Sequence, residues 1–202
     1  MKKFFRGIRD ALLFQTEADA ERRIVFYSEG AAYAPYLRPV IDALSQCYDG
    51  TIYYLTSDND DQLLIQPPPR VCSYYIGKGG ARTFVLNNLT AKLVVMTMPD
   101  MNTFHIKRSS KAKHYAYLHH SLVSTHMVYR KGAFDCFDSI FCAGQYHIDE
   151  IREWENLHGF KAKKLVEHGY GPLDELIDIA NSEKQKSATN KNAVSEDRYD
   201  IL

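Results

Sequence analysis

Seven short apolar runs recur along the chain, and most are followed by a turn and then by a stretch of helical character. The runs lie at 23–27, 51–56, 71–76, 93–98, 115–118, 139–142 and 164–167. Apolar runs of this length between turn residues are typical of buried strands. The nearly continuous apolar run at 93–98 favours a strand that is covered on both faces. The alternation predicts an α/β fold, a doubly wound and mostly parallel Rossmann-like sheet of six or seven strands.

A parallel sheet with right-handed crossovers brings the carboxyl ends of all its strands to one edge. Open α/β sheets bind ligands in a crevice at that edge. The segments that follow the predicted strands are rich in glycine and in small or polar residues. They are 28–30, 56–58, 77–80, 98–100, 119–121, 143–144 and 168–171. This recurrence predicts a ligand site without reference to any known family.

The most informative of these segments is His119-His120-Ser121, which follows the apolar run 115–118. An imidazole titrates near neutral pH and can serve as a general base. Successive side chains of a strand alternate sides, so at most one of the two histidines can face the crevice. The alternative is a pair of structural histidines bonded to backbone carbonyls. Ser121 has no G-x-S-x-G elbow around it, which argues against a serine hydrolase.

This stretch resembles the N-terminal half of the CDP-glycerol glycerophosphotransferase family, enzymes that build or prime wall teichoic acid. In that family a strand ending in His-Gly-Thr presents a histidine proposed as the base. His120 matches this histidine, although the Gly-Thr pair is absent here. The sequence EHGYGPLD at 167–174 is similar to the family's Gly-Tyr-Pro-Arg-x-Asp segment, again with departures. The resemblance spans 23–176.

The resemblance implies a GT-B enzyme of which this chain is the N-terminal half. Residues 1–20 would form a basic amphipathic helix, 21–180 the Rossmann-like acceptor-side domain, and 181–202 a polar linker with the start of a missing C-terminal domain. That missing half would bind the CDP-glycerol donor. The 181–198 stretch has almost no apolar residues and is typical of a linker or disorder, and 199–202 resembles the start of a strand.

In this reading His120 removes the proton from a hydroxyl of a glycerol-phosphate or saccharide acceptor. The expected substrate-binding residues are Ser28, Glu29, Gly30, His105, Arg108, His119, Ser121, His168, Gly169 and Tyr170. Glu29 suits a hydroxyl better than a phosphate because like charges repel. The cations of the loop around Arg108 could hold an acceptor phosphate, and a solvated loop is the alternative.

Two other functions are compatible with these patterns. One is half of a GT-B glycosyltransferase that uses a nucleotide sugar. The other is a non-catalytic ligand-binding or scaffold domain from a truncated reading frame.

The glycine-rich segment Gly77-Lys78-Gly79-Gly80 could meet an anion with its backbone amides, or it could be a plain turn, since it matches neither common glycine motif.

The composition limits the classes of partner and cofactor that we expect for this chain. The 25 basic and 25 acidic residues balance, which predicts no nucleic-acid partner. The four cysteines form no CxxC and no metal-ligand spacing, so neither a metal nor a cofactor is expected. Cys72 and Cys142 fall inside apolar runs and are expected in the core. With no secretory signal and no apolar run near the ~20 residues of a membrane span, we expect a cytoplasmic location.

The N-terminal segment adds a second expectation about location. On a helix, Phe4, Phe5, Ile8 and Leu12 share one face, while Lys2, Lys3, Arg6 and Arg9 gather toward the other. A short basic amphipathic helix can bind the surface of an anionic membrane, which would place the protein peripherally on the inner membrane face. The alternative is a helix that packs on the body of the protein or on a missing domain.

Overall fold

The computed structural model describes residues 2–16, 23–102 and 105–196, and the side chains of 5–16, 23–102 and 105–184. The chain divides into two compact units, Met1–Gly169 and Tyr170–Leu202. Each unit is described by itself. The first contains all the described strands and every candidate site residue except Tyr170.

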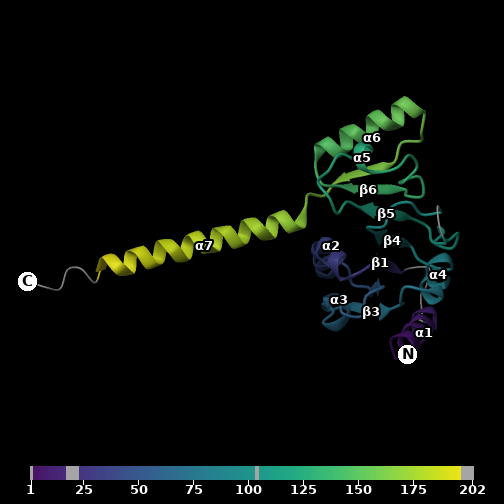
Figure 1. The fold of residues 1–202 in the computed structure, drawn as a ribbon, viewed down its shortest axis with the longest axis horizontal. Coiled ribbons are helices and arrows are strands. Elements are labelled where there is room, and N and C mark those ends of the chain that lie inside the picture. The colour runs from purple at the N-terminus through teal and green to yellow at the C-terminus, as the bar shows by residue number, and fades with distance from the viewer. Residues whose placement is uncertain (1, 17–22, 103–104, 197–202) are drawn as a thin grey trace, which may run out of the picture. The chain divides into compact units, whose positions relative to one another are not determined.

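The first unit is built on a seven-stranded sheet with the strand order β3-β2-β1-β4-β5-β6-β7 (Figure 1). All neighbouring pairs are parallel. The strands are β1 (Ile24–Ser28), β2 (Ile52–Thr56), β3 (Val71–Tyr75), β4 (Leu93–Met96), β5 (Tyr115–Leu118), β6 (Ser139–Cys142) and β7 (Lys164–Glu167). The predicted α/β doubly wound class is confirmed.

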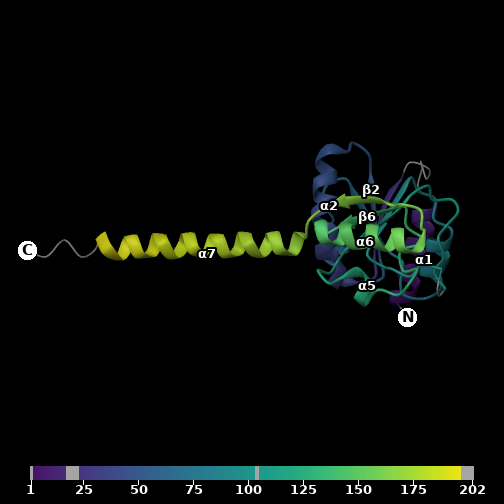
Figure 2. The ribbon, with the colours of Figure 1, turned by 90° about the horizontal axis from the view of Figure 1, so that it is seen from above.

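Helices cover both faces of this sheet (Figures 1 and 2). They are α1 (Lys2–Thr16), η2 (Ala31–Tyr33), α2 (Ala34–Cys47), α3 (Gln62–Ile65), α4 (Gly80–Asn87), α5 (Thr125–Val128) and α6 (Gln145–His158). Alternate side chains of β1 enter different cores, as a period of two requires. Val25 and Tyr27 pack in the core that includes residues of α1, α4 and α6, while Phe26 packs with α2 and α3.

The strand order changes direction between β1 and β4. The chain runs outward from β1 through β2 to β3, then returns to the other side of β1 to form β4. The loops after β1 and β4 therefore leave in opposite directions, and it is outside the carboxyl ends of such strands that open α/β sheets bind their ligands. The residues after β5 lie one strand away from this point, and those after β7 lie three strands away.

Helix α1 closes the β3 edge of the sheet. Its Phe14 is fully buried and makes edge contacts with Tyr53 and Tyr74 at 5.8 and 5.7 Å. The carboxylate of Asp10 accepts a hydrogen bond from the backbone N–H of Tyr75 at 3.3 Å, which satisfies a donor of the edge strand. The packing alternative for the N-terminal helix thus holds for one face of α1. The predicted helix extended to residue 20, but 17–20 lie outside the described residues.

The second unit is dominated by one helix, α7 (Gly171–Glu196). The sequence predicts a polar linker from 181, and in the structure α7 runs through 181–196. No proline or glycine occurs between 173 and 196, so no backbone constraint ends the helix there. The unit boundary also falls at 169/170 rather than at 180. The predicted strand start at 199–202 lies outside the described residues.

Of the two cysteines predicted in the core, only Cys142 is buried. Cys142 is buried, and burial raises the pKa of its thiol to about 12. Cys72 is exposed, so its predicted place in the core is wrong. It lies in β3, the edge strand of the sheet, where one face is less completely covered. Among the described helices, none combines the length and apolar character needed to cross a membrane.

Candidate functional site at the carboxyl edge of the sheet

The two histidines after β5 have opposite surroundings. The backbone N–H of His119 donates to the carbonyl of Phe141 at 3.1 Å, which extends the β5–β6 pairing by one residue. Side chains therefore continue to alternate through this position. His119 is 2% exposed, while His120 is only half-buried at the carboxyl end of the strand.

His119 belongs to the core. Its ring stacks on that of His147 with centroids 4.2 Å apart. Burial, followed by the nearby His147 and His120, lowers the pKa of His119 to about 3. Neither of its ring nitrogens has a hydrogen-bond partner among the described residues. His119 is thus a neutral core residue, and it lacks the carbonyl bonds expected of a structural histidine.

His147 has those bonds instead. Its Nε2 lies 2.9 Å from the carbonyl of Val123, and its Nδ1 accepts from the backbone N–H of Ala143 at 3.3 Å. This fully buried side chain joins the segment after β5 to the β6–α6 turn. The stacked pair of His119 and His147 therefore fixes the backbone from which His120 projects.

The ring of His120 lies against three tyrosines. Tyr33 and Tyr36, from the segment after β1, make edge contacts at 5.2 and 5.9 Å. The hydroxyl of Tyr117 lies 3.3 Å from Nδ1 of His120 and 3.0 Å from the hydroxyl of Tyr129. Burial lowers the pKa of His120, so the imidazole is neutral at neutral pH and able to accept a proton.

The contact between Tyr117 and His120 is compatible with two tautomers. The Tyr117 hydroxyl either donates to Nδ1 of His120 or accepts from Nδ1–H, and either hydroxyl of the Tyr117–Tyr129 pair can be the donor. When Tyr117 donates to Tyr129, its oxygen accepts from Nδ1–H of His120 and Nε2 is the basic nitrogen, which is the arrangement that a general base needs.

The segment after β1 adds a carboxylate to this region. Burial raises the pKa of Glu29, and the charge of Arg82 partly opposes that shift. After burial, the charge of Glu29 further raises the pKa of Tyr33 and of Tyr117, two of the three tyrosines beside His120. Glu29 and His120, which are 91 residues apart in the sequence, therefore lie near the same tyrosines, Tyr33 and Tyr117.

The neighbouring residues make this segment unfavourable for a phosphate. Ser28 is buried and donates to the carbonyl of Gly30 at 2.7 Å. The carboxylate of Asp58 already accepts from the N–H of Ala31 at 3.3 Å. Two carboxylates beside one turn repel an anion, an effect that the charge of Arg82 near Glu29 partly offsets, and they can accept hydrogen bonds from hydroxyl groups.

The glycine-rich segment 77–80 precedes α4 as predicted. Gly77 has a φ of 69°, a conformation that favours glycine, whereas a Cβ at Gly79 or Gly80 would meet nothing within 4 Å. No side chain caps the N-terminus of α4. A helix N-terminus alone does not define a site, so this segment is still either an anion-binding loop or a plain turn.

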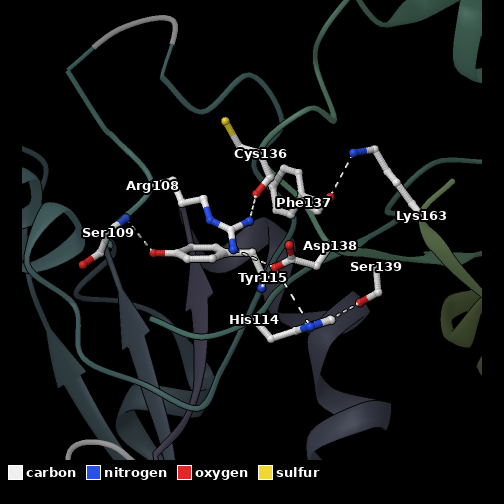
Figure 3. Close-up of polar contacts among 9 residues, drawn as sticks. All are labelled: Arg108, Ser109, His114, Tyr115, Cys136, Phe137, Asp138, Ser139 and Lys163. Atoms are coloured by element: carbon white, nitrogen blue, oxygen red, sulfur yellow. Dashed lines mark hydrogen bonds and ion pairs between the residues drawn. The ribbon is translucent and has the colours of Figure 1, made fainter. Parts of the chain in front are cut away.

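Arg108 does not join the residues around His120. Its guanidinium donates to Asp138 at 2.8 Å and to the carbonyl of Cys136 at 2.6 Å, and it lies over the ring of Tyr115 (Figure 3). These partners are at the amino ends of β5 and β6, so Arg108 occupies the edge of the sheet opposite to His120. His105 is exposed, and its carbonyl accepts from Asn87 at the end of α4.

The remaining predicted residues are spread along the carboxyl edge. Ser121 follows His120, and its hydroxyl accepts from the N–H of Val123 at 3.4 Å. His168 follows β7, where its N–H donates to the carbonyl of Cys142 at 2.8 Å and its ring contacts Phe141. Gly169, with a φ of 83°, ends the first unit. Tyr170 belongs to the second unit.

Sequence reasoning missed the tyrosines that surround His120. Tyr117 lies on the predicted strand itself, two residues before the pair of histidines, so alternation places it on the same side as His119. Its ring contacts His119 and also meets the ring of His120, with centroids 6.4 Å apart. Tyr33 and Tyr36 follow the predicted turn after β1. Two aromatic residues directly after a strand at the switch point were the available signal.

Two cavities lie elsewhere in the first unit. One, of about 250 Å³, lies between α6 and the segment 125–135 and is lined by Trp154, Ile151 and Tyr129 among others. The other, of about 580 Å³, is lined by the first residues of β1, β4, β6 and β7. His120 lines neither. Tyr129 connects the first cavity to His120 through the hydroxyl of Tyr117.

The fold and this edge define an α/β domain with a doubly wound parallel sheet and a neutral, tyrosine-held histidine beside the switch point. Comparisons with protein-family models, curated proteins and solved structures find no match. Within the described residues, no group of three or more His, Cys, Asp or Glu side chains is arranged to hold a metal ion.

Proposed function

We propose that this chain is the acceptor-side domain of a CDP-glycerol glycerophosphotransferase-like enzyme. The observation that carries the proposal is His120, a neutral imidazole at the carboxyl edge whose Nδ1 is held by Tyr117 and whose ring faces Tyr33 and Tyr36. This is the position at which the family resemblance expects the base. The charge of Glu29 in the same surroundings supports a ligand rich in hydroxyl groups.

The proposed reaction transfers glycerol phosphate to an acceptor of the wall teichoic acid type. Nε2 of His120 takes the proton of the acceptor hydroxyl while the acceptor oxygen attacks the phosphorus that carries glycerol. A new P–O bond forms, the P–O bond to the cytidine phosphate breaks, and CMP leaves. General base catalysis of this kind contributes typically ~10²–10⁴-fold. The donor and its departing charge would be held by a second half that is not part of this chain.

The surroundings of His120 favour a saccharide or glycerol acceptor contacted through its hydroxyls. The rings of Tyr33 and Tyr36 offer apolar faces, and Glu29 offers a hydrogen-bond acceptor. The cationic loop that was expected to hold an acceptor phosphate lies at the other edge of the sheet, because Arg108 is bonded there to Asp138. We therefore propose that any acceptor phosphate is bound away from the imidazole.

Nuclear magnetic resonance on the 202-residue chain with labelled histidine tests the proposal. We expect glycerol phosphate or a saccharide to shift the His120 ring signals, which His120→Gln identifies by removing them. His126→Gln, at an exposed histidine of α5, is the matched control and should leave the titration unchanged. No response of His120 to any hydroxylated ligand would favour a scaffold domain instead.

A donor screen separates the two enzyme classes. It requires the reading frame extended beyond Leu202, if that frame encodes a second half. CMP release from CDP-glycerol, lowered ~10²–10⁴-fold by His120→Ala, is the expected result. UDP release from a UDP-sugar, with CDP-glycerol unused, would replace the proposal with a GT-B glycosyltransferase.

A further inference from the structure

The cavity of about 250 Å³ beside α6 has one wall made of aromatic rings from the end of that helix. Helix α6 ends at Gly159, whose φ of 62° is a left-handed conformation that glycine adopts readily. The N–H of Phe160 then donates to the carbonyl of Glu155 at 2.9 Å, which turns the chain back along the helix. The ring of His158 contacts those of Trp154 and Phe160, with centroids 3.9 and 5.6 Å away. This turn therefore holds Trp154 and Phe160, which both line the cavity, in one wall.

The opposite wall comes from the segment that follows α5. The rings of Tyr129 and Phe134 pack with centroids 4.8 Å apart, and both line the cavity. The carbonyl of Ala133 accepts from the backbone N–H of Asp100 at 2.9 Å, and the side chain of Arg130 pairs with the Asp100 carboxylate at 3.1 Å. These bonds fix the second wall to the loop after β4, so its position does not depend on a ligand.

The floor of the cavity is apolar. Ile140 of β6 and Ile151 of α6 are both buried and line it. A cavity of roughly 150 Å³ with an apolar lining holds one benzene ring, so a volume of about 250 Å³ fits a ligand of about two fused rings. Aromatic walls favour flat rings, because offset and edge contacts between rings add to the burial of apolar area. The volume and the lining therefore select a planar aromatic ligand.

The charged groups at this cavity include two lysines without a carboxylate partner. The carboxylate of Glu155 is satisfied, because it accepts from Arg152 and from the backbone N–H of Lys163 at 2.8 Å. The ammonium group of Lys163 donates to the carbonyl of Phe137 at 2.9 Å, which is a neutral partner (Figure 3). Lys161 is exposed, and neither lysine makes an ion pair with a carboxylate of the described residues.

The other charged residues of the lining leave this excess in place. Arg130 pairs with Asp100 and adds no net charge. A positive charge on His126 would be offset by Glu150, 3.9 Å away. Asp135 is exposed and makes no ion pair within the described part of the chain. The unpaired charges are therefore two ammonium groups and one carboxylate, 2 − 1 = +1, which favours a ligand with one negative charge.

We propose that the cavity beside α6 binds a small planar aromatic carboxylate, with its rings between the two aromatic walls and its carboxylate at Lys161 and Lys163. An ammonium group has three donors, so Lys163 can bind an anion and keep its bond to the Phe137 carbonyl. The site is separate from His120, which lines neither cavity, and the inference does not depend on the proposed transferase activity.

Titration of the 202-residue chain with three probes is the test. Naphthoate, naphthylmethanol and naphthylmethylammonium share one ring system and are anionic, neutral and cationic. The chain has a single tryptophan, so the indole N–H signal of Trp154 in nuclear magnetic resonance reports on a side chain that lines this cavity. We expect naphthoate to shift this signal to saturation, with an affinity at least about tenfold above that of naphthylmethanol. The cation should bind most weakly.

Lysine variants test the selection by charge. Lys161→Gln/Lys163→Gln should lower the affinity for naphthoate about tenfold and leave that for naphthylmethanol unchanged. The matched control is Lys92→Gln/Lys164→Gln, which removes two lysines that line the other cavity and make no ion pair within the described residues. It causes the same change in net charge and should bind both probes like the parent chain. Lys161→Gln alone keeps the bond of Lys163 to Phe137 and should lower naphthoate binding roughly threefold.

Wall variants test the location. Ala133 is 2% exposed and lines the cavity, so Ala133→Leu should fill part of the volume and weaken naphthoate and naphthylmethanol alike, by at least about tenfold. Phe160→Ser covers the case in which this variant fails to fold, as circular dichroism would show. It removes a ring that is 39% exposed and should weaken both probes about fivefold.

Four results would overturn the inference. The first is no shift of the Trp154 indole signal with naphthoate up to millimolar concentration. The second is equal affinity for naphthoate and naphthylmethanol, which would make the cavity a site for neutral apolar ligands. The third is a Lys161→Gln/Lys163→Gln variant that binds naphthoate like its control. The fourth is naphthoate binding that is unchanged in the folded wall variants, which would place the ligand elsewhere.

Discussion

The hydroxyl oxygen of Tyr117 lies 3.3 Å from Nδ1 of His120, and it is the contact that converts a partly buried histidine into an oriented one. Tyr117 is itself fixed, because it is fully buried and packs against Phe134 and Phe137 at 4.8 and 5.3 Å. The bond to Tyr129 holds its hydroxyl in one direction. The core of the domain thereby holds Nδ1 of His120 at the Tyr117 hydroxyl.

Tyr117→Phe should change the tautomer of His120. Without the hydroxyl, Nδ1–H loses its acceptor, so the preference for a basic Nε2 should fall, as read from the ¹⁵N chemical shifts of the ring. The lost hydrogen bonds should lower the free energy of unfolding by about 1 kcal/mol.

Tyr27→Phe is the control for this prediction. It removes another buried tyrosine hydroxyl, bonded to Ser57 at 2.9 Å and away from His120. It should cost a similar amount of stability and leave the tautomer unchanged. Equal tautomer populations in all three proteins would show that Tyr117 does not orient the ring.

His119 should make the protein sensitive to acid. Its pKa is lowered to about 3 by burial, whereas an unfolded histidine titrates near ~6.5. Between these values the unfolded state binds the extra proton, so stability falls as pH decreases, by at most about 1.4 kcal/mol per pH unit. His119→Phe, which keeps an aromatic ring beside His147, should remove this part of the slope.

Urea unfolding at pH 7, 6 and 5 (roughly the window below the unfolded pKa) measures the difference between the two proteins. The other titratable groups are common to both, so the comparison isolates His119. Wild-type protein should lose stability relative to His119→Phe as the pH falls. An equal change in the free energy of unfolding with pH in the two proteins would mean that His119 stays neutral in both states or charges without cost.

Arg108 should matter for stability and not for ligand binding at His120. Arg108→Ala removes the charged hydrogen bonds to Asp138 and to the carbonyl of Cys136, at a cost of about 2 kcal/mol. Burial alone would raise the pKa of Asp138, but the hydrogen bonds from Arg108 and from the backbone of Tyr115, with the charges of Arg108 and His114, together keep that pKa below its ordinary value. Wild-type stability should therefore decline as the pH falls from the unfolded value of ~3.9 through the lower folded value, and Arg108→Ala should weaken this decline.

The same variant tests the sequence-based role of Arg108. If it binds an acceptor phosphate, Arg108→Ala should weaken the response of His120 to glycerol phosphate more than to glycerol. The structure leads us to expect equal responses, since the two side chains lie at opposite edges of the sheet. A selective loss with glycerol phosphate would restore the original prediction.

Local signals were sufficient for the sheet and its carboxyl edge. Each strand is a buried apolar run, and the rule for parallel crossovers then places Glu29 and His120 at one edge without further information. Arg108 could not be placed in this way. The segment from Met98 to His114 carries the chain from the carboxyl end of β4 to the amino end of β5, and the point at which Arg108 falls depends on its bond to Asp138, 30 residues later.

The face by which α1 packs on the sheet could also not be predicted from local sequence. The buried face contains Gly7 and Asp10, which look less suited to a core than Phe5 and Leu12 on the exposed face. Asp10 is buried there because it meets the backbone of Tyr75, a long-range contact. The exposed position of Cys72 has a similar origin, since only the strand order reveals that β3 is an edge.

The purified 202-residue chain should not release CMP from CDP-glycerol. Transition-state stabilisation in phosphoryl transfer needs cations or amides aimed at the charge that develops on the phosphates. The ring of His120 contacts three tyrosines, and the segment after β1 contributes the carboxylate of Glu29, with Asp58 bonded to Ala31. A base alone contributes typically ~10²–10⁴-fold, well short of the ~10⁶-fold or more of an enzyme.

Chromatographic detection of CMP, with and without a hydroxylated acceptor, measures this directly. The expected result is binding of the acceptor, seen through His120, with CMP release no faster than in buffer. His120→Gln should abolish the binding signal and leave the CMP trace unchanged. Acceptor-dependent CMP release by the isolated chain would require a donor site within the first unit, and the amides at Gly79 and Gly80 with the neighbouring Lys78 and Arg82 would be the first place to locate it, by substitution of the two cations.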